Sequence, residues 1–172
     1  MPKDNQSELF YLVDDSDQVL GSVSRLEAHQ SQTLKHRSVF VLVFTDKEEF
    51  ILQKRSQSKD SFPGFWTVSA SGHVSYGQSY LEAAQRELME ELGLDLDLEE
   101  LYKDYFVEER EFATVFQAHL STKDLINFDR EEIEVLSFVK IKDLEKFVKE
   151  NKLTPSALKV LSDLSYLTYL RL

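Results

Sequence analysis

The sequence predicts an α+β fold in which a mixed sheet lies between helices, an α/β/α sandwich. Short apolar or alternating runs typical of strands occur along most of the 172 residues, a strongly amphipathic segment lies near the middle, and two helical segments follow towards the C-terminal end. Strands that enclose one helix and are backed by others favour this layered arrangement. With 42% hydrophobic residues the chain can bury a sizeable core, so we expect one domain over residues 1–172.

Residues 1–35 are expected to form a hairpin and a connecting segment packed on this domain. Residues 8–13 and 18–23 flank the polar turn Asp14-Asp15-Ser16-Asp17, which indicates a β-hairpin. Residues 25–30 can form a short helix before a polar stretch.

The strands of the main sheet are predicted from the runs that follow. Residues 39–44 form an apolar run suited to a buried strand, and residues 49–54 would pair with it across a polar turn. A turn with aromatic residues at 62–65 precedes an alternating run at 66–70, which predicts a further strand. Three more strands are expected at 104–107, 114–120 and 135–141. Two helices are expected after them, at 142–150 and 156–167.

The amphipathic helix near the middle has well-defined ends. Ser79 with Glu82 three residues later has the form of a capping box, and Gly93 stands where a helix usually ends. At about 100° per residue, one narrow apolar stripe runs along the helix, formed by Leu81, Ala84, Leu88 and Leu92. Three carboxylates share a sector of roughly 100°, with the last of them beside that stripe: Glu87, Glu90 and Glu91.

These three carboxylates suggest a metal site. Like charges three and four residues apart repel each other by roughly a few tenths of a kcal/mol when they are exposed. The repulsion grows at the edge of a core, so a cation is the natural relief. Converging carboxylate oxygens without sulfur suit a hard ion such as Mg²⁺.

The segment GHVSYGQSYLEAAQRELMEELGL at 72–94 resembles the signature of the Nudix hydrolase family. The positions that match in identity and spacing are Gly72, Arg86, Glu87, Leu88, Glu90, Glu91, Gly93 and Leu94. The resemblance implies a single Nudix domain, with a mixed sheet and a catalytic loop-helix-loop whose glutamates hold Mg²⁺ or Mn²⁺. One position departs from the signature: its first glutamate is Gln78 here, which keeps an acceptor for Arg86 but loses the charge.

A longer part of the chain, from about His29 to Glu111, also resembles type 1 isopentenyl diphosphate isomerases and the Nudix hydrolases close to them. The resemblance is carried by HQSQTLKH at 29–36, KRSQSKDSFPGFW at 54–66, SGH at 71–73 and EEREFATVF at 108–116. It implies that one metal ion is held by His29, His36, His73, Glu109 and Glu111. It also implies that Glu91 contributes to a second ion bound with the substrate, and that Arg55 and Lys59 bind the diphosphate.

The histidines and carboxylates of this second set also have the chemistry of a metal site on their own. Neutral imidazoles with two carboxylates suit Zn²⁺ or Mn²⁺ better than Mg²⁺. Glu109 and Glu111 alternate around Arg110, so on a strand both would point the same way. On one unbroken helix His29 and His36 would lie roughly 10 Å apart, so we expect the chain to turn between them.

Ser71 separates this chain from the isomerases, which carry at this position a catalytic cysteine that takes part in moving a proton at carbon. A serine hydroxyl holds its proton far more tightly than a thiol, whose pKa is about 8.5. The chain has no cysteine that could replace it. Isomerase chemistry is therefore disfavoured, although the binding architecture can persist.

Net charge and composition exclude several classes of partner. A net charge of −11 disfavours nonspecific binding to nucleic acid or to an anionic membrane. No apolar run approaches the roughly 20 residues of a membrane span, and the N-terminal MPKDNQSELF lacks the pattern of a secretory signal. Together with the absence of cysteine, these features indicate a cytoplasmic protein.

The sequence therefore predicts a metal-dependent Nudix hydrolase that cleaves a diphosphate linkage in a small molecule, either a nucleoside diphosphate linked to a second group or another organic diphosphate. Arg55 and Lys59 would bind this substrate. The expected catalytic set is Glu87, Glu91, Glu111 and Arg86, with the general base left open among Glu91, Glu109 and Glu111. Two alternatives remain: an isomerase-like enzyme, and a diphosphate-binding protein that has lost catalysis through the Gln78 departure. The oligomeric state also stays open.

Overall fold

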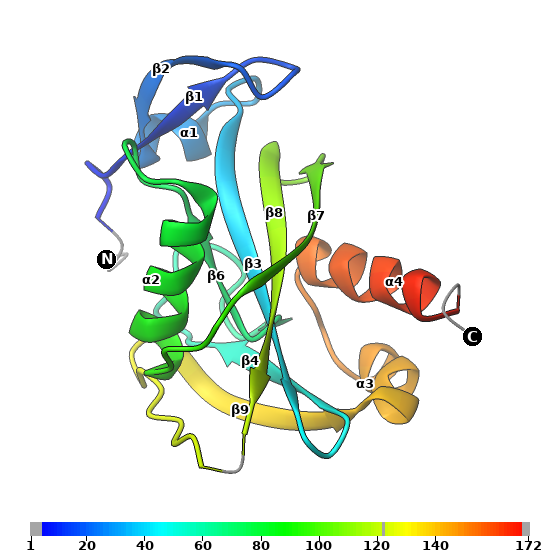
Figure 1. Cartoon of the computed structure of the whole chain (residues 1–172). Coiled ribbons are helices and arrows are strands. Elements are labelled where there is room, and N and C mark those ends of the chain that lie inside the picture. Colours follow the sequence, from blue (N-terminus) through cyan, green and yellow to red (C-terminus); the bar gives the residue numbers. More distant parts are fainter. Residues whose placement is uncertain (1–4, 122, 170–172) are drawn as a thin grey trace.

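A computed structural model describes residues 5–121 and 123–169 and arranges them as a mixed sheet between helices (Figure 1). The central path of the seven-stranded sheet runs β5-β4-β3-β8-β7, while β6 pairs with β3 and β9 pairs with β4. β3 and β8 are parallel, and the other neighbouring strands are antiparallel. The strands are β3 (His36–Thr45), β4 (Glu49–Arg55), β5 (Trp66–Thr67), β6 (Ala70–His73), β7 (Glu99–Phe106), β8 (Glu111–Leu120) and β9 (Ile133–Lys140).

Helices cover both faces of this sheet, as the predicted sandwich requires. Helix α2 (Tyr80–Leu92) packs on Val39 and Val41 of β3 through Ala83, Ala84, Leu88 and Leu92. Helices α3 (Leu144–Glu150) and α4 (Pro155–Tyr169) cover the opposite face, where Phe40 and Leu42 point. Because side chains alternate along a strand, a strand that is apolar at every position is buried on both sides. The apolar run at 39–44 behaves in this way.

The N-terminal residues form a separate two-stranded hairpin of β1 (Leu9–Val13) and β2 (Val19–Ser24), followed by helix α1 (Arg25–Gln30). The hairpin is attached to the main body by backbone hydrogen bonds, from Tyr76 N to Leu9 O and from Val13 N to Lys35 O. The predicted hairpin and short helix are confirmed. The assignment of 1–172 to one domain stays a prediction, and residues 1–4, 122 and 170–172 lie outside the described part.

The single strand predicted at 66–70 is wrong, because the chain changes partner within it. β5 pairs with β4, and β6 pairs with β3. Between them the Ser69 hydroxyl accepts a hydrogen bond from Val43 N at 2.8 Å and donates one to Ile51 O. Ser69 thus links β3 and β4 across the gap that opens beyond their one paired position, Phe44 with Phe50.

Several predicted boundaries also shift. β7 begins at Glu99 and β8 at Glu111, both earlier than the apolar runs suggested, and a 3₁₀ turn (Ile141–Asp143) precedes α3. Leu81 is 43% exposed and does not belong to the apolar stripe of α2, where Ala83 is buried instead. Within the described ranges no helix has both the length and the apolar character needed to cross a bilayer.

Candidate active site

A cavity of about 830 Å³ opens among α1, β3, β6, α2, the loop 56–65 and the start of α4. Every residue that the sequence nominated for metal or substrate binding lines this cavity except His36. Residues from both resemblances therefore meet in one place. The two predicted constellations therefore lie around one cavity, and the roles of their residues stay predictions.

Local sequence signals fix the helix that carries the glutamates. Ser79 and Glu82 form the predicted capping box at the start of α2, since each side chain accepts a hydrogen bond from the other's backbone N–H. At the other end Gly93 adopts a left-handed conformation with φ of 66°, which glycine accommodates without a steric penalty. Glu91 then falls on the buried side beside Leu88 and Leu92, as predicted.

Glu87 lies directly against the backbone of Gly72. A Cβ added at Gly72 would collide with the Glu87 carboxylate, so any larger residue here would displace that side chain. Burial raises the pKa of Glu87 to about 8, and the neighbouring Glu91 charge adds to the effect. The Arg86 guanidinium, 2.8 Å from Glu87 Oε1, offsets it only in part.

Glu91 is held by two donors at the edge of the sheet. Its Oε2 accepts hydrogen bonds from Gln53 Nε2 at 2.6 Å and from Ser71 N at 3.1 Å. Burial raises the pKa of Glu91 to about 7, although Lys59 and Arg55 act in the opposite direction. Two adjacent buried carboxylates that resist ionisation fit a divalent cation, because its charge would stabilise both anions.

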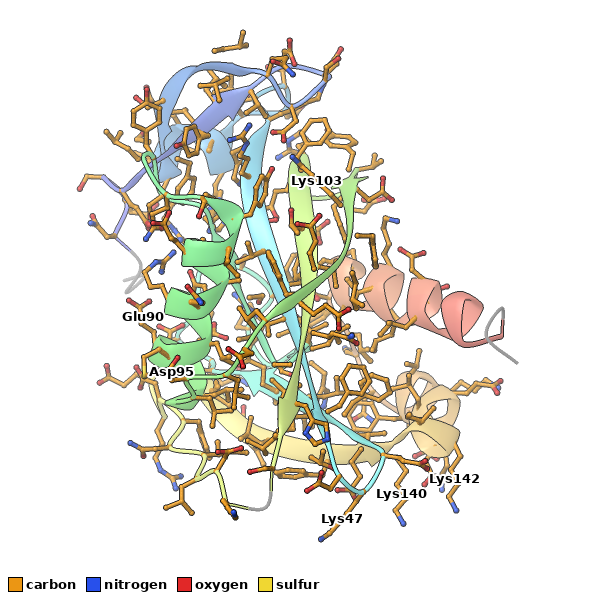
Figure 2. All side chains as sticks on the ribbon, in the orientation of Figure 1. Lys47, Glu90, Asp95, Lys103, Lys140 and Lys142 are labelled. Carbon is orange, nitrogen blue, oxygen red and sulfur yellow. The ribbon has the colours of Figure 1, made fainter. Side chains whose placement is uncertain are left out.

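Arg86 keeps its place despite the departure at position 78. Gln78 Oε1 accepts a hydrogen bond from Arg86 Nε at 3.4 Å, and Arg86 Nη2 donates to His73 O. Its Nη1 also lies 3.0 Å from Glu90 Oε2. The Glu90 side chain is 60% exposed and lies on the outer side of α2 (Figure 2).

Three histidines come together although they are far apart in the sequence. His29 near the end of α1, His36 at the start of β3 and His73 at the end of β6 offer ring nitrogens that all lie within 4.8 Å of one another. The predicted turn between His29 and His36 is confirmed, because α1 ends at Gln30. Phe10 of the hairpin stacks on His73 with 4.3 Å between the ring centroids, so β1 supports the cluster.

The histidine cluster also fits a cation. Glu111 Oε1 lies 3.1 Å from His36 Nε2 and 3.3 Å from His73 Nε2. The other ring nitrogen of buried His36, Nδ1, makes no hydrogen bond with the described residues. Burial lowers the pKa of His73 to about 3, which keeps its imidazole neutral as metal ligation requires. Burial would raise the pKa of Glu111, but the adjoining imidazoles hold it well below its usual range.

Glu109 does not lie where the alternation predicted. β8 begins only at Glu111, and Arg110 before it has φ of 58°, so residues 107–110 form a turn. Glu109 and Glu111 therefore do not leave one strand in the same direction, and that expectation is wrong. Glu109 Oε1 instead accepts a hydrogen bond from Ser156 N at 3.0 Å, at the start of α4.

Arg55 and Lys59 both line the cavity, and their binding of a diphosphate stays a prediction. Arg55 Nε donates to Ser61 O at 3.1 Å and so braces the loop 56–65. Lys59 Nζ lies 2.6 Å from Glu132 Oε2.

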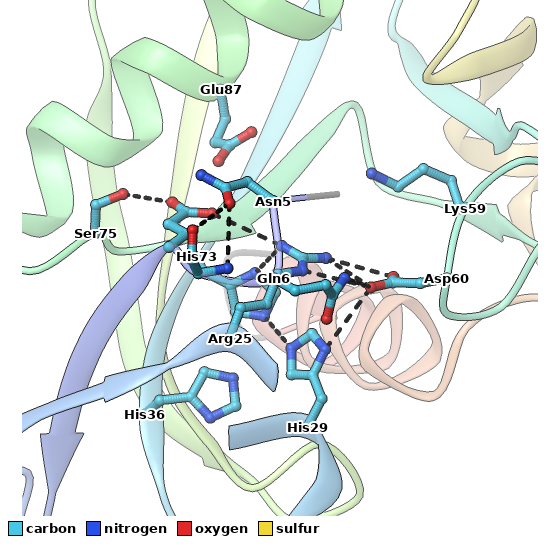
Figure 3. A network of polar contacts seen from close by, with 12 residues as sticks. Asn5, Gln6, Arg25, His29, His36, Lys59, Asp60, His73, Ser75 and Glu87 are labelled. Atoms are coloured by element: carbon cyan, nitrogen blue, oxygen red, sulfur yellow. Dashed lines mark hydrogen bonds and ion pairs between the residues drawn. The ribbon is translucent and has the colours of Figure 1, made fainter. Parts of the chain in front are cut away.

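Sequence reasoning missed three residues that organise the site: Gln53, Arg25 and Asp60. Buried Arg25 pairs with Asp60 at 3.3 Å, and its Nη1 lies 3.4 Å from His73 Nδ1 (Figure 3). Asp60 belongs to the same loop as Lys59, so this pair ties the loop to α1. Gln53 directly follows the apolar run 50–52 and offers no strong signal, and Arg25 and Asp60 meet only through the fold.

A family model described as NUDIX domain matches residues 34–164. The chain belongs to the Nudix family. A protein of Pseudomonas aeruginosa named as an uncharacterized Nudix hydrolase is 35% identical over 139 residues, which cover 79% of this chain and 80% of that protein. An isopentenyl-diphosphate Delta-isomerase of Serratia proteamaculans is 40% identical over 94 residues, covering 55% of this chain and only 52% of the isomerase.

Solved structures confirm the Nudix fold. The protein DR0079 of Deinococcus radiodurans has a TM-score of 0.77 and 22% identity, with 91% of this chain and 98% of that one covered. The NUDIX domain of Shewanella oneidensis NrtR, solved in complex with ADP ribose, has a TM-score of 0.59 and 16% identity, with 75% and 85% covered. Nudix enzymes generally use divalent metals such as Mg²⁺ or Mn²⁺.

Proposed function

We propose that this Nudix protein is a metal-dependent hydrolase that cleaves the diphosphate linkage of a small organic molecule. The observation that carries the proposal is the buried pair Glu87 and Glu91, whose pKa values are raised to about 8 and about 7. When both carboxylates are ionised, such a pair is unfavourable unless a cation shares its charge. The loop that carries Lys59 and Arg55 faces the same cavity and offers the cationic groups that a diphosphate needs.

Each residue has a role that follows from its place. Glu87, Glu90 and Glu91 would hold Mg²⁺ or Mn²⁺, which when bound neutralises phosphate oxygens and lowers the pKa of water. Arg86 orients Glu87 and Glu90 through its contacts with both. Arg55 and Lys59 would hold the distal phosphate.

The surroundings of Glu91 and Glu111 decide which of them we propose as the general base. Glu91 has a raised pKa, and its Oε2 is already occupied by Gln53 and Ser71. Glu111 has a pKa well below the usual range and is engaged with two histidines. Within the described residues both hydrogen bonds of Glu91 fall on Oε2, which leaves Oε1 to take a proton, whereas Glu111 Oε1 lies against His36 and His73; we therefore assign this role to Glu91.

The decisive experiment is a phosphate-release assay over a panel of organic diphosphates, with Mg²⁺ and Mn²⁺ compared. Glu91→Gln keeps the shape of the side chain and removes its charge, so nearly all metal-dependent hydrolysis should disappear. Activity of the variant within about threefold of the wild type would defeat the assignment, because removing one positioned charge at a reacting centre usually costs about 10² or more in rate.

A second candidate function is isomerisation of isopentenyl diphosphate, favoured by the three-histidine cluster with Glu111 and by the similarity to isomerases. Ser71 argues against it, since its hydroxyl is a far weaker acid than a thiol. Incubation with isopentenyl diphosphate should yield no dimethylallyl isomer. Formation of that isomer by the wild type would show a working isomerase. Its appearance only in Ser71→Cys would show a chain that lost this chemistry with the cysteine.

The histidine cluster is proposed to hold a second ion, Mn²⁺ or Zn²⁺. Titration of the metal-free protein with Mn²⁺, followed by electron paramagnetic resonance, should then show two classes of site, of which His36→Gln removes one. The third reading, a non-catalytic diphosphate-binding protein, predicts binding without turnover. The retained contact between Gln78 and Arg86 speaks against it.

A further inference from the structure

One wall of the cavity contains a buried hydroxyl, that of Ser38. Ser38 is only 3% exposed, lines the cavity, and its Oγ makes no hydrogen bond with the described residues. It lies on β3 between His36 and Phe40, on the same strand face as both. A buried hydroxyl is normally satisfied by protein or water, so Ser38 Oγ is available for a ligand in this cavity.

A second buried polar group, Nε of Arg110, belongs to a residue that lines the same cavity. Arg110 Nε is buried and has no hydrogen-bond partner among the residues that the structure describes. Its backbone has φ of 58°, a conformation that a non-glycine residue rarely adopts. The turn before β8 thus holds a guanidinium donor at the cavity at some conformational cost.

Between and around these groups the wall is polar rather than hydrocarbon. Thr154 Oγ1 lies 3.4 Å from Thr67 Oγ1 and 3.2 Å from Ser156 Oγ, and all three residues line the cavity. Glu109 adds a carboxylate that is anchored on Ser156 N. Phe40 supplies one apolar surface within this wall.

The hydrogen-bonding capacities of these groups define the chemistry of a matching ligand. Ser38 Oγ can donate one hydrogen bond and accept others, Arg110 Nε can only donate, and Glu109 can only accept. Hydroxyl groups can meet each of the three, because a hydroxyl both donates and accepts. A hydrocarbon meets none of them, and an ionised phosphate has no donor for Glu109, which lines the same cavity.

We propose that the wall formed by Ser38, Arg110 and the start of α4 is a subsite for a neutral, hydroxylated group, such as a pentose or hexose ring, on the organic part of the substrate. The inference rests on the proposed diphosphate hydrolysis and names its substrate class. The diphosphate then lies towards Arg55 and Lys59, and the sugar lies against β3. A prenyl chain, although it carries the same diphosphate, does not fit this wall.

The test compares hydroxylated with hydrocarbon diphosphates in two proteins that differ by one oxygen atom. kcat/KM is measured for ADP-ribose, UDP-glucose, isopentenyl diphosphate and geranyl diphosphate, with wild type and Ser38→Ala. Binding of the same compounds is measured by titration calorimetry. Ser137→Ala, a half-buried serine of β9 away from the cavity, is the matched control.

The proposal expects at least one sugar compound to exceed both prenyl compounds in kcat/KM by about 10² or more. Ser38→Ala should lower kcat/KM and affinity for that sugar compound by about threefold to tenfold and leave the prenyl compounds and the control unchanged. Preference for a prenyl compound, or an equal effect of Ser38→Ala on both classes, overturns it. Should no diphosphate be cleaved, hydrolysis fails as the function, and the calorimetric comparison alone decides the subsite.

Discussion

The Glu87 carboxylate occupies the space that a side chain at Gly72 would fill. This relationship joins the first and the central parts of the Nudix signature, because a strand residue of β6 makes room for a helix residue of α2. The glycine acts here through its missing Cβ. The position of one proposed metal ligand is therefore set by the backbone of a neighbouring strand.

Gly72→Ala should displace Glu87 and reduce metal-dependent hydrolysis by about 10² or more, since a shift of about 1 Å in a catalytic group costs that much. Affinity for Mn²⁺ should fall in parallel, as followed by electron paramagnetic resonance. Circular dichroism at the temperature of the assay checks that the variant is folded. A folded variant with Mn²⁺ affinity and kcat within about threefold of the wild type would contradict the role given to this contact.

The raised pKa values of Glu87 and Glu91 make the stability of the metal-free protein dependent on pH. An acid whose folded-state pKa exceeds its unfolded value near 4.3 stabilises the fold fully below that value, and the contribution is lost as pH rises through the folded pKa. The stabilisation from Glu91 is therefore fully lost only above about pH 7, and that from Glu87 only above about pH 8. Unfolding free energy in EDTA should fall between pH 6.5 and 9.

This pH window avoids the histidine cluster. The pKa of His73 is lowered to about 3, so its contribution to stability rises with pH and is complete above the unfolded value of about 6.5. Urea denaturation should show that the unfolding free energy of the wild type is lower at pH 9 than at pH 6.5 by about 1 kcal/mol or more. Glu87→Gln should largely remove this difference, and saturating Mg²⁺ should reduce it. A wild-type loss that Glu87→Gln leaves intact would show that other groups titrate.

Arg25 and Asp60 should matter more for stability than their places in the sequence suggest. Asp60→Asn leaves the buried Arg25 guanidinium without one charged partner, although Glu8 remains 4.0 Å away. We expect a loss of about 1–3 kcal/mol in unfolding free energy by urea denaturation. Asp46→Asn, which breaks the exposed pair of Asp46 with His119, is the control and should change stability by about 0.5 kcal/mol or less. Equal effects of the two variants would contradict the difference in burial.

The sequence predicted α2 almost completely because its signals are local. Ser79, Glu82 and Gly93 determine the two ends through contacts within a few residues, and Glu91 follows from the helical period. The meeting of His29, His36 and His73 is different. Periodicity alone would leave them apart, and only the resemblance to a family of known proteins placed them at one metal ion.

The errors arise where the chain changes direction or partner without a residue type that marks it. The turn before β8 contains no glycine or proline, so Glu109 and Glu111 read as alternating strand residues. The strand expected at 66–70 is divided because its first part pairs with β4 and its last residue belongs to a strand that pairs with β3. No local sequence pattern marks this change of partner. Gln53 and Asp60 acquire their importance from neighbours that lie far away in the sequence.

Lys59 is proposed to bind the substrate, yet its ammonium lies 2.6 Å from the Glu132 carboxylate, which competes with a phosphate for the same charge. Lys59→Met should therefore raise KM for a cleaved diphosphate by about tenfold, and Glu132→Gln should lower KM by about threefold, with kcat little changed in both. Lys54 and Glu134, at 2.7 Å, form a similar pair outside the cavity and supply matched controls, Lys54→Met and Glu134→Gln. Added salt should weaken the effect of Lys59→Met, because screening reduces the contribution that the charge makes. A rise in KM with Glu132→Gln would show that this carboxylate positions Lys59 for the phosphate and does not compete with it.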